Sequence, residues 1–319
     1  YILYTENSQA GALYVDLYQS LENTKAYLVV DDGTKVAVKL DLSPEGVSIS
    51  QTFTEKTFNR KTIGSPASLI DAGVINKANP ANFAFKIPVF KENDIEVVHD
   101  RLLDCNTFDL YISTTEEVFK LEKAVITNGT YEIEKSTPLS LSVSGEASKL
   151  SRMGPPGSYT IPGTLQPITA GRTYLQSSEI EVSLNAVNIS TEVYSLSVEL
   201  QNEVSWNPNN TIHSSLNTTN ATNIIYPLNF TVSKKILAGS VGRYITDSND
   251  TFVQNFDESR SLVIKVGQRI GGTLYGFTFN MPTVSVTNRM TPSEVYTQNY
   301  DWRLTSNQAL TTTITYNNI

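Results

Sequence analysis

LDLSPEGVSIS (Leu40–Ser50) and VNISTEVYSLS (Val187–Ser197) read as two copies of one segment, 147 residues apart. A second pair follows at the same spacing: NFAFKI at Asn82–Ile87 and NFTVSK at Asn229–Lys234. One such match arises easily by chance in a chain rich in Asn and Thr. A second match at the same offset indicates a duplicated domain.

A third pair, TPLSLSVSGEASKL from Thr137 and TPSEVYTQNYDWRL from Thr291, lies 154 residues apart and keeps the order. Between the copies, RMGPPGSYTIPGTLQPITAG is rich in Pro and Gly and has little apolar periodicity, which is typical of a linker. The sequence therefore predicts a first domain over 1–152 with an N-terminal extension, a linker over 153–171 and a second domain over 172–319.

Each copy alternates apolar and polar residues with the period of a β-strand. YLVV–DDGT–KVAVKLDL (Tyr27–Leu42) predicts a hairpin, since Asp32-Gly33 suits the positive φ of a tight turn. Asn128-Gly129, between VFKLEKAVI and TYEIEKS, is the strongest hairpin signal in the chain and predicts a second one.

One short helix is expected in each copy. IEVVHDRLLD places Val97, Val98, Leu102 and Leu103 on neighbouring turns of one face, with Asn93 or Asp94 as the N-cap. A weaker counterpart follows Asp250. We expect a mainly β fold of two tandem β-sandwich or half-barrel domains, each with one short flanking helix.

The composition argues against several classes of function. The net charge is −8, with 15 basic and 21 acidic residues in 1–152, and an acidic chain is a poor nucleic-acid binder. One cysteine and two histidines do not suffice for an ordinary zinc site. No cofactor motif, such as a phosphate-binding Gly loop, is present, and no run of about 20 apolar residues suggests a membrane helix.

Catalytic residues are not evident either. Cys105 and His99 are not on one helical face and lack a third group to orient the histidine, so we expect a buried thiol and a surface histidine. The acidic residues around them sit at helical spacing and fit a solvated helix face. We expect no enzymatic activity and no metal site.

Two long segments stand between early strands, TEKTFNRKTIGSPASLIDAGVINKANPA (54–81) and QNEVSWNPNNTIHSSLNTTNATNIIYPL (201–228). Loops of this length in compact domains are usually functional or disordered. Their apolar content argues against plain disorder and for docking onto a neighbour. The candidate contact residues are Ile63, Leu69, Ile70, Val74, Ile75, Trp206, Ile212, Ile224, Ile225 and Tyr226.

Duplicated acidic β-domains with one helix each and a long early loop resemble the bacteriophage tail tube protein family. The segments that carry the resemblance are LDLSPEGVSISQTF, NFAFKIPVF, TPSEVYTQNYDWRL and the two long arms; residues 1–21 do not match it. The resemblance implies six tube domains per ring, inner strands joined into a β-barrel, and stacked rings contacted by the long loop. A duplicated chain of the kind found in some siphophages would form a homotrimer with a pseudo-hexameric ring.

The resemblance also implies a structural virion protein of the phage tail, made in the host cytoplasm, whose acidic lumen lets genome DNA pass without specific binding. Glu122, Glu132 and Glu134, flanking the expected Asn128-Gly129 hairpin, are the candidate lumen acids. The expected partners are other copies of the chain and further tail proteins, namely tape measure, terminator, and baseplate or tip. The alternative is a secreted or surface β-sandwich adhesin or appendage subunit, favoured by the many Asn-x-Ser/Thr sequons; an enzyme on a β-sandwich ranks third.

Overall fold

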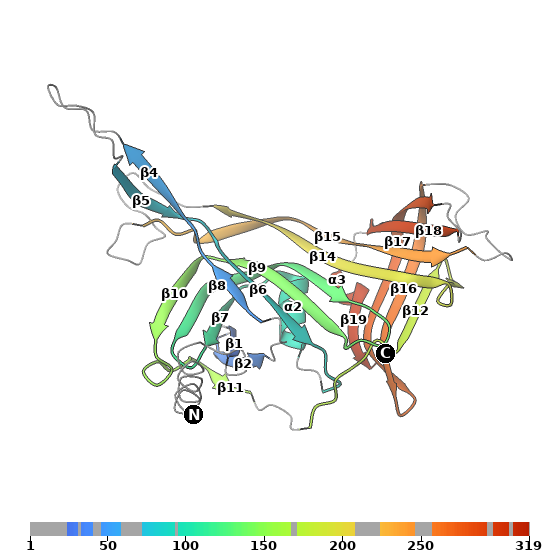
Figure 1. Cartoon of the computed structure of the whole chain (residues 1–319), viewed down its shortest axis with the longest axis horizontal. Helices are drawn as coiled ribbons and strands as arrows, with labels where there is room; N and C mark the ends of the chain where they lie inside the picture. Colours follow the sequence, from blue (N-terminus) through green and yellow to red (C-terminus); the bar gives the residue numbers. More distant parts are fainter. Residues whose placement is uncertain are drawn as a thin grey trace, which may run out of the picture.

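The computed structural model describes residues 24–30, 33–40, 46–58, 72–92, 95–166, 171–207, 224–245, 257–291, 296–305 and 309–318. The fold is mainly β, with two sets of strands and one helix longer than a single turn among the described residues (Figure 1). No helix in these ranges is long and apolar enough to cross a membrane.

The first set of strands runs along the chain as β1 to β10. Its body comprises β1 (Lys25–Val30), β2 (Val36–Leu40), β3 (Ser48–Ser50), β6 (Ala81–Pro88), β7 (Phe108–Ser113), β8 (Val118–Glu132), β9 (Ser140–Ala147) and β10 (Lys149–Gly154). The antiparallel pairs follow the order β2-β1-β7-β8-β9-β6-β3. β10 pairs with the first half of β8 and closes this set toward a barrel (Figure 1).

The second set repeats this order. Its strands are β12 (Glu179–Leu184), β13 (Val187–Asn188), β14 (Val193–Asn207), β15 (Asn229–Tyr244), β16 (Asp257–Ile270), β17 (Thr273–Thr291), β18 (Thr297–Leu304) and β19 (Ile314–Asn318). They pair in the order β13-β12-β16-β17-β18-β15-β14, strand for strand the pattern of the first set. Both sets are therefore built on one strand order.

The three sequence landmarks lead into corresponding strands, since β3, β6 and β9 of the first set take the places of β14, β15 and β18 in the second. NFAFKI lies in β6, which pairs with β9, and the part of β15 that pairs with the corresponding strand β18 is Ala238–Tyr244. NFTVSK lies farther toward the N-terminus of β15, opposite the end of β14. NFAFKI and NFTVSK therefore lie in corresponding strands but not at the same register, because NFTVSK precedes the part of β15 that pairs with β18.

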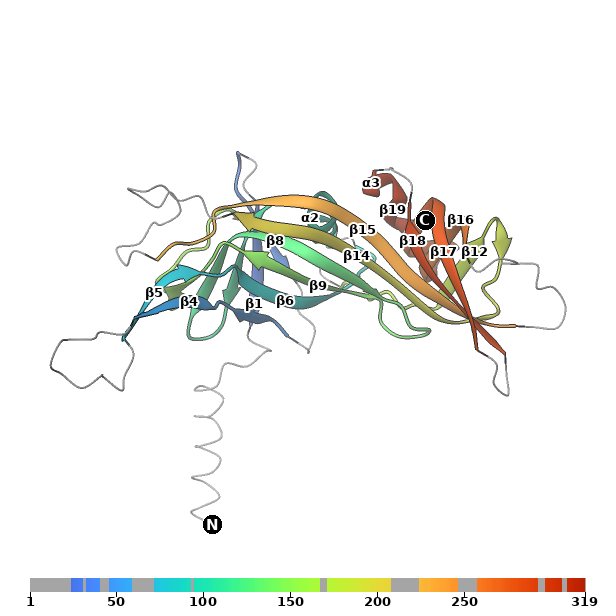
Figure 2. The same cartoon turned by 90° about the horizontal axis from the view of Figure 1, so that it is seen from above.

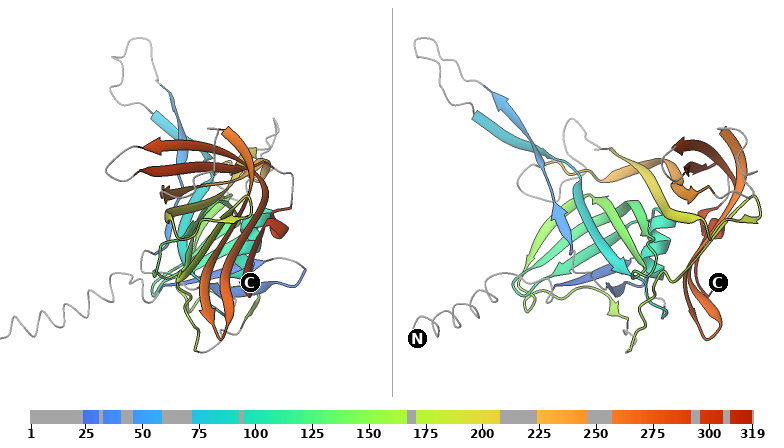
Figure 3. Two further views of the ribbon diagram at one scale, coloured as in Figure 1. Left: turned by 90° about the vertical axis from the view of Figure 1, so that its right-hand side faces the viewer. Right: turned by 45° about the vertical axis from the view of Figure 1, so that its right-hand side comes forward.

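The first arm is a two-stranded β-hairpin rather than a loop. β4 (Phe53–Phe58) pairs with β5 (Ala72–Ala78), and the pair continues β3 and β6 away from the body (Figures 1 and 3). In the second set, β14 and β15 are themselves long enough to make the equivalent extension. The hydrogen bonds between the two strands of each arm satisfy its backbone groups. Each arm can therefore extend from the body without a further sheet against it.

The two sets share one hydrophobic core and one sheet. β8 pairs with β14 over four residues, from Asn128–Gln201 to Tyr131–Val198, so that both sets join edge to edge (Figure 2). Behind this junction, Tyr131 packs edge-on against Phe277 and Phe279 with ring centroids 4.9 and 4.8 Å apart. An apolar interface of this kind fixes the relative position of the two halves.

Helix α2 (Glu96–Asp104) confirms the expected first helix and covers the junction. Val98, Leu102 and Leu103 are buried, as predicted, and Val97 is half-buried. Asn93 and Asp94, the expected caps, lie outside the described residues, as does the segment expected to form the second helix. The described residues contain one further helix, the four-residue α3 (Leu310–Thr313), near the C-terminal end.

The hairpin expected at Asn128-Gly129 is absent, because both residues lie inside the continuous strand β8. Gly129 is needed for close packing and not for a turn, because a Cβ atom there would lie 2.3 Å from Cδ2 of Leu102 on α2. The hairpin expected over Tyr27–Leu42 is confirmed by the pairing of β1 with β2, from Ala26–Leu40 to Val30–Val36.

The Pro/Gly segment between the two sets packs against the first of them. β11 (Thr164–Leu165) runs parallel to β2, and Tyr159 stacks on Tyr111 with centroids 6.0 Å apart. Farther on, the backbone of Leu175 donates to Val89 and accepts from Leu139 at 3.0 and 2.8 Å. Its described parts are thus held to the body rather than extended as a free tether.

Candidate functional site

One face of the joined sheet is the most distinctive surface of the protein. The sheet runs β3-β6-β9-β8-β14-β15-β18-β17 through both halves of the chain (Figure 2). Successive side chains of a strand point to opposite faces, so one residue in two belongs to each face. The inner face carries the apolar core, and the other face is open.

The open face carries small and polar side chains from end to end. One row of register partners crosses seven strands: Lys86, Ser142, Thr130, Glu199, Ala238, Arg303 and Ser285. The row beside it on the opposite face consists of Phe85, Val143, Gly129, Leu200 and Leu237, all of which are buried, and Gly129 lies against α2. We call the open face of these eight strands the polar face.

Charge on the polar face is nearly balanced. Its described acidic residues are Glu132, Glu146, Glu199, Glu203 and Asp301, and its described basic residues are Lys86, Lys234, Arg289 and Arg303. The acidic excess of the whole chain is therefore not concentrated here.

The carboxylates of the polar face are tied to neighbouring strands. Asn128 Nδ2 donates to Glu199 Oε1 at 2.8 Å across the β8–β14 junction, and Ser142 Oγ donates to Glu132 Oε1 at 2.9 Å. Burial raises the pKa of the Glu146 carboxyl above its ordinary value, and the hydrogen bond from the indole N–H of Trp206 offsets part of this rise. Such contacts hold acidic groups in fixed positions on a face made mostly of hydroxyls.

The three candidate lumen acids do not lie together. Glu132 and Glu134 lie at the end of β8 beside the polar face, and both are exposed. Glu122 lies in the first half of β8, where its Oε1 is 3.4 Å from Nζ of Lys120 and its register partner is Lys149 on β10. The sequence prediction placed all three around one turn, but the continuous course of β8 separates Glu122 from the others.

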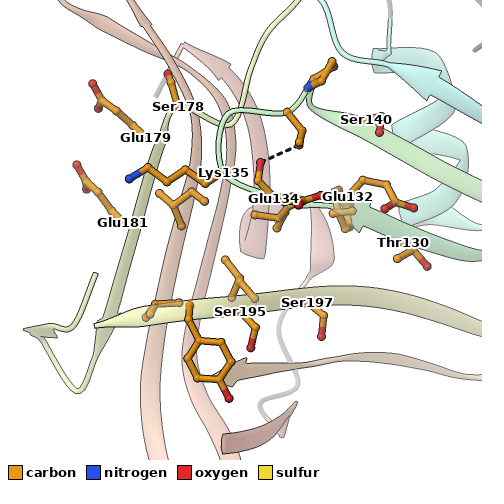
Figure 4. Close-up of a pocket in the computed structure, with 18 of the residues that line it drawn as sticks. Thr130, Glu132, Glu134, Lys135, Ser140, Ser178, Glu179, Glu181, Ser195 and Ser197 are labelled. Carbon is orange, nitrogen blue, oxygen red and sulfur yellow. Dashed lines mark hydrogen bonds between the residues drawn. The ribbon is translucent and has the colours of Figure 1, made fainter. Parts of the chain in front are cut away.

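A hollow of about 1560 Å³ opens where the two halves meet. Its walls come from the end of β6, the turn between β8 and β9, the strand β12 and the start of β14. Lys135 extends from the turn toward Glu179 and Glu181 of β12, whereas Glu132 at the end of β8 points the other way, toward Thr130, with Ser195 and Ser197 below (Figure 4). Glu179 and Glu181 already pair with Arg269 and Lys265.

The predicted contact residues fall into three groups. Ile63, Leu69, Ile70 and Ile212 lie outside the described residues. Val74 and Ile75 lie on β5 of the first arm. The remaining four, Trp206, Ile224, Ile225 and Tyr226, lie at the base of the second arm and are half-buried or buried.

The base of the second arm packs on the first half of the same chain. The carbonyl of Ile225 accepts from the backbone N–H of Ala78 at 2.8 Å, and Tyr226 is 7% exposed. Trp206 donates to Glu146 on β9 at 2.7 Å. For these residues, contacts within the chain account for burial without a neighbouring subunit, because the end of β14 and the segment before β15 run beside β9 and β5.

Among the described residues, no group of three or more His, Cys, Asp and Glu side chains converges in a way that could hold a metal ion. Cys105 is buried, as expected, and burial raises the pKa of its thiol. The prediction that His99 lies on the surface was wrong: the side chain is fully buried, because Phe277 and Tyr316 of the second half pack against its ring.

Residues 93–319 match the model of the Bacteriophage Baseplate Tube Protein Family. The chain belongs to this family. The match covers the β8–β14 junction and all of the second strand set, whereas β3 and β6 of the polar face precede it. The family is one of structural tube proteins of the virion tail and its baseplate, not of enzymes. A comparison with curated proteins finds no match.

Proposed function

We propose that three copies of this baseplate tube protein close into a pseudo-hexameric ring whose bore is lined by the polar face. The observation that carries the proposal is the β8–β14 ladder, which joins two equivalent strand sets into one sheet. Three such chains supply about 24 strands, enough for a barrel with an open aqueous channel.

The strand order supports six equivalent units from three chains. Because the two sets pair in the same order, they act as successive units around the ring. Closed rings with repeated interfaces are the usual outcome of such association. Joining two units in one chain also removes half of the association steps, each of which costs translational and rotational entropy.

The chemistry of the polar face suits a conduit for genome DNA. Hydroxyls and paired carboxylates offer phosphate groups few cations, whereas rows of Lys and Arg would bind the backbone by releasing counterions. With five acidic and four basic residues described on the face, we infer a weakly acidic bore instead of a strongly acidic one. DNA would then pass during ejection without specific binding.

Rings of this protein would stack into the tube segment of the baseplate. Its partners would be further copies of the chain and adjacent tail proteins, with the tape measure protein passing through or ending at the segment, and terminator or tip proteins at its ends. The protein would be made in the host cytoplasm and act in the assembled virion.

The number of chains in the ring tests the proposal. Native mass spectrometry of the purified protein is expected to show a species of three 35.2-kDa chains. Negative-stain images of the same sample should show rings with a central hole. A monomer at all concentrations, or a ring of six chains, would refute it.

A further inference from the structure

We propose that Tyr194 and Tyr244, with Asn299 beside them, form a binding site for an extended, proline-rich segment of another polypeptide. The site lies on the polar face of the second half, where β14 and β18 begin and β15 ends. That the bound segment would lie in the bore rests on the proposed function, whereas the site itself belongs to the single chain.

The two tyrosine rings form an exposed aromatic surface. Their centroids are 4.9 Å apart, and the side chains of Tyr194 and Tyr244 are 45% and 44% exposed. The hydroxyl of Tyr194 donates to Oδ1 of Asn299 at 2.9 Å, which holds the ring of a β14 residue across β15 to β18. Large exposed rings in a fixed position mark an interaction site on a face that otherwise carries small and charged side chains.

The backbone is shaped to hold Tyr194 in this position. A β-bulge between Val193 and Ser195 makes Tyr194 the extra residue of β14, and bulges re-aim side chains. On β15, Gly242 leaves the space that the ring occupies, because a Cβ atom there would lie 2.8 Å from Cζ of Tyr194. A side chain at Gly242 would therefore displace the ring without removing it.

A buried polar cluster supports the same three strands from beneath. Arg243 is 2% exposed, and its guanidinium donates to Oε2 of Glu192 at 2.9 Å and to Oε1 of Gln298 at 3.1 and 2.8 Å. Each of these three residues lies one or two positions along the chain from a residue of the site. Side chains that are locked by buried partners are a general feature of preorganised binding sites.

The fold itself does not require this cluster. The corresponding inner face of β6 and β9 in the first half is apolar and buried, with Phe83, Phe85, Ile87, Leu141 and Val143. Removing an arginine from water is costly even when it is paired. Exceptions to an apolar core are concentrated at functional sites, so the cluster indicates that the surface above it has a function.

The polar groups beside the rings indicate the chemistry of the ligand. Oδ1 of Asn299 accepts from Tyr194, so Asn299 presents its Nδ2 hydrogens as donors, and the hydroxyl of Tyr244 adds another. A proline-rich segment matches these groups, because its rings stack on aromatic faces and its backbone offers carbonyl acceptors without N–H donors. Its polyproline II conformation is extended before binding, which lowers the entropic cost.

Nucleic acid is a poorer match for the site. Arg289, the register partner of Asn299 on β17, is ion-paired with Asp301. Phosphate groups need available cations, and aromatic platforms that bind single strands are accompanied by a positively charged groove. The bases of a duplex are stacked on one another and do not reach the tyrosine faces. The site therefore selects a polypeptide and not the genome.

Fluorescence anisotropy of labelled decaproline with the purified protein tests the site. We expect saturable binding of one peptide per chain, and an affinity about tenfold lower in Tyr194→Ala and in Tyr244→Ala, because interface tyrosines are typical hot spots. Gly242→Ala keeps both tyrosines but displaces one ring, and should weaken binding to a similar degree. Leu165→Ala removes another exposed apolar side chain, on the Pro/Gly segment, and is the control that should bind as the unchanged protein does.

The outcomes separate this inference from the proposed function. Lack of saturable decaproline binding, or equal affinity in the tyrosine variants and the unchanged protein, would overturn the inference. Tighter binding of short duplex DNA that is lost in the same variants would overturn it as well. If the peptide binds as expected but no rings form, or if reconstructions of the rings place it on their outer wall, the inference holds and the proposed function fails.

Discussion

At the scale of single residues, His99 shows how the two halves depend on each other. Its Nε2 is 3.0 Å from Oη of Tyr131, and its ring packs against Phe277 and Tyr316 of the second half, with centroids 5.9 and 4.9 Å away. Burial lowers the pKa of His99 from 6.5 to about 4. A buried imidazole of this kind stays neutral in the folded protein.

This burial predicts acid sensitivity. Unfolded chains bind a proton at His99 near pH 6.5, whereas the folded chain does so only near pH 4, so the free energy of unfolding falls as the pH falls through this window. At pH 5 the free energy of unfolding is roughly 2 kcal/mol lower than at pH 7. Urea unfolding at several pH values measures it.

The variants give a clear contrast. His99→Phe keeps an aromatic ring but removes the titrating group, and the slope between pH 6.5 and 5 should largely disappear. Tyr131→Phe removes the hydroxyl partner and should keep the slope. Equal slopes in the unchanged protein and in His99→Phe would contradict the account.

At the scale of elements, the packing of α2 on β8 decides the course of the strand. Gly129→Ala would force a methyl group against Leu102, and overpacking of a close-packed core costs about 1–3 kcal/mol. Chemical denaturation should show this loss. Gly157→Ala is the matched control, since no atom lies within 4 Å of its Cβ position, and it should be close to neutral.

A double variant makes the cause specific. If the methyl group collides with Leu102, then adding Gly129→Ala to Leu102→Ala should cost much less than adding it to the unchanged protein. Additive losses would mean that Gly129 is required for another reason.

β8 also shows why the hairpin predicted at Asn128-Gly129 was wrong. Asn-Gly is a strong turn signal because both residues tolerate positive φ. The alternation of apolar residues on either side of Asn128-Gly129 is equally compatible with two strands or with one. Only the contact with α2, which depends on the three-dimensional fold, requires a glycine at this place in a straight strand. The hairpin over Tyr27–Leu42 was predicted correctly, because β1 and β2 pair with each other as the local pattern indicates.

At the scale of the whole molecule, the repeated landmarks were sufficient to predict β-rich halves with one strand order. They could not reveal the β8–β14 ladder or the shared core, because these contacts join residues far apart in the sequence, such as Tyr131 with Val198 and with Phe277, and leave no local periodicity. The polar face was partly visible as Ser residues that alternate with apolar ones in SLSVSGEA and YSLSVEL. That its rows continue from one half into the other follows only from the register of the joined strands.

The central claim is that the polar face lines the bore of a three-chain ring, and an electron cryomicroscopy reconstruction of the purified rings tests it most directly. We predict threefold symmetry with six similar units, and Ser142, Thr130 and Glu199 facing the central channel. A ring in which these residues face outward, or in which six whole chains surround the channel, would contradict the account.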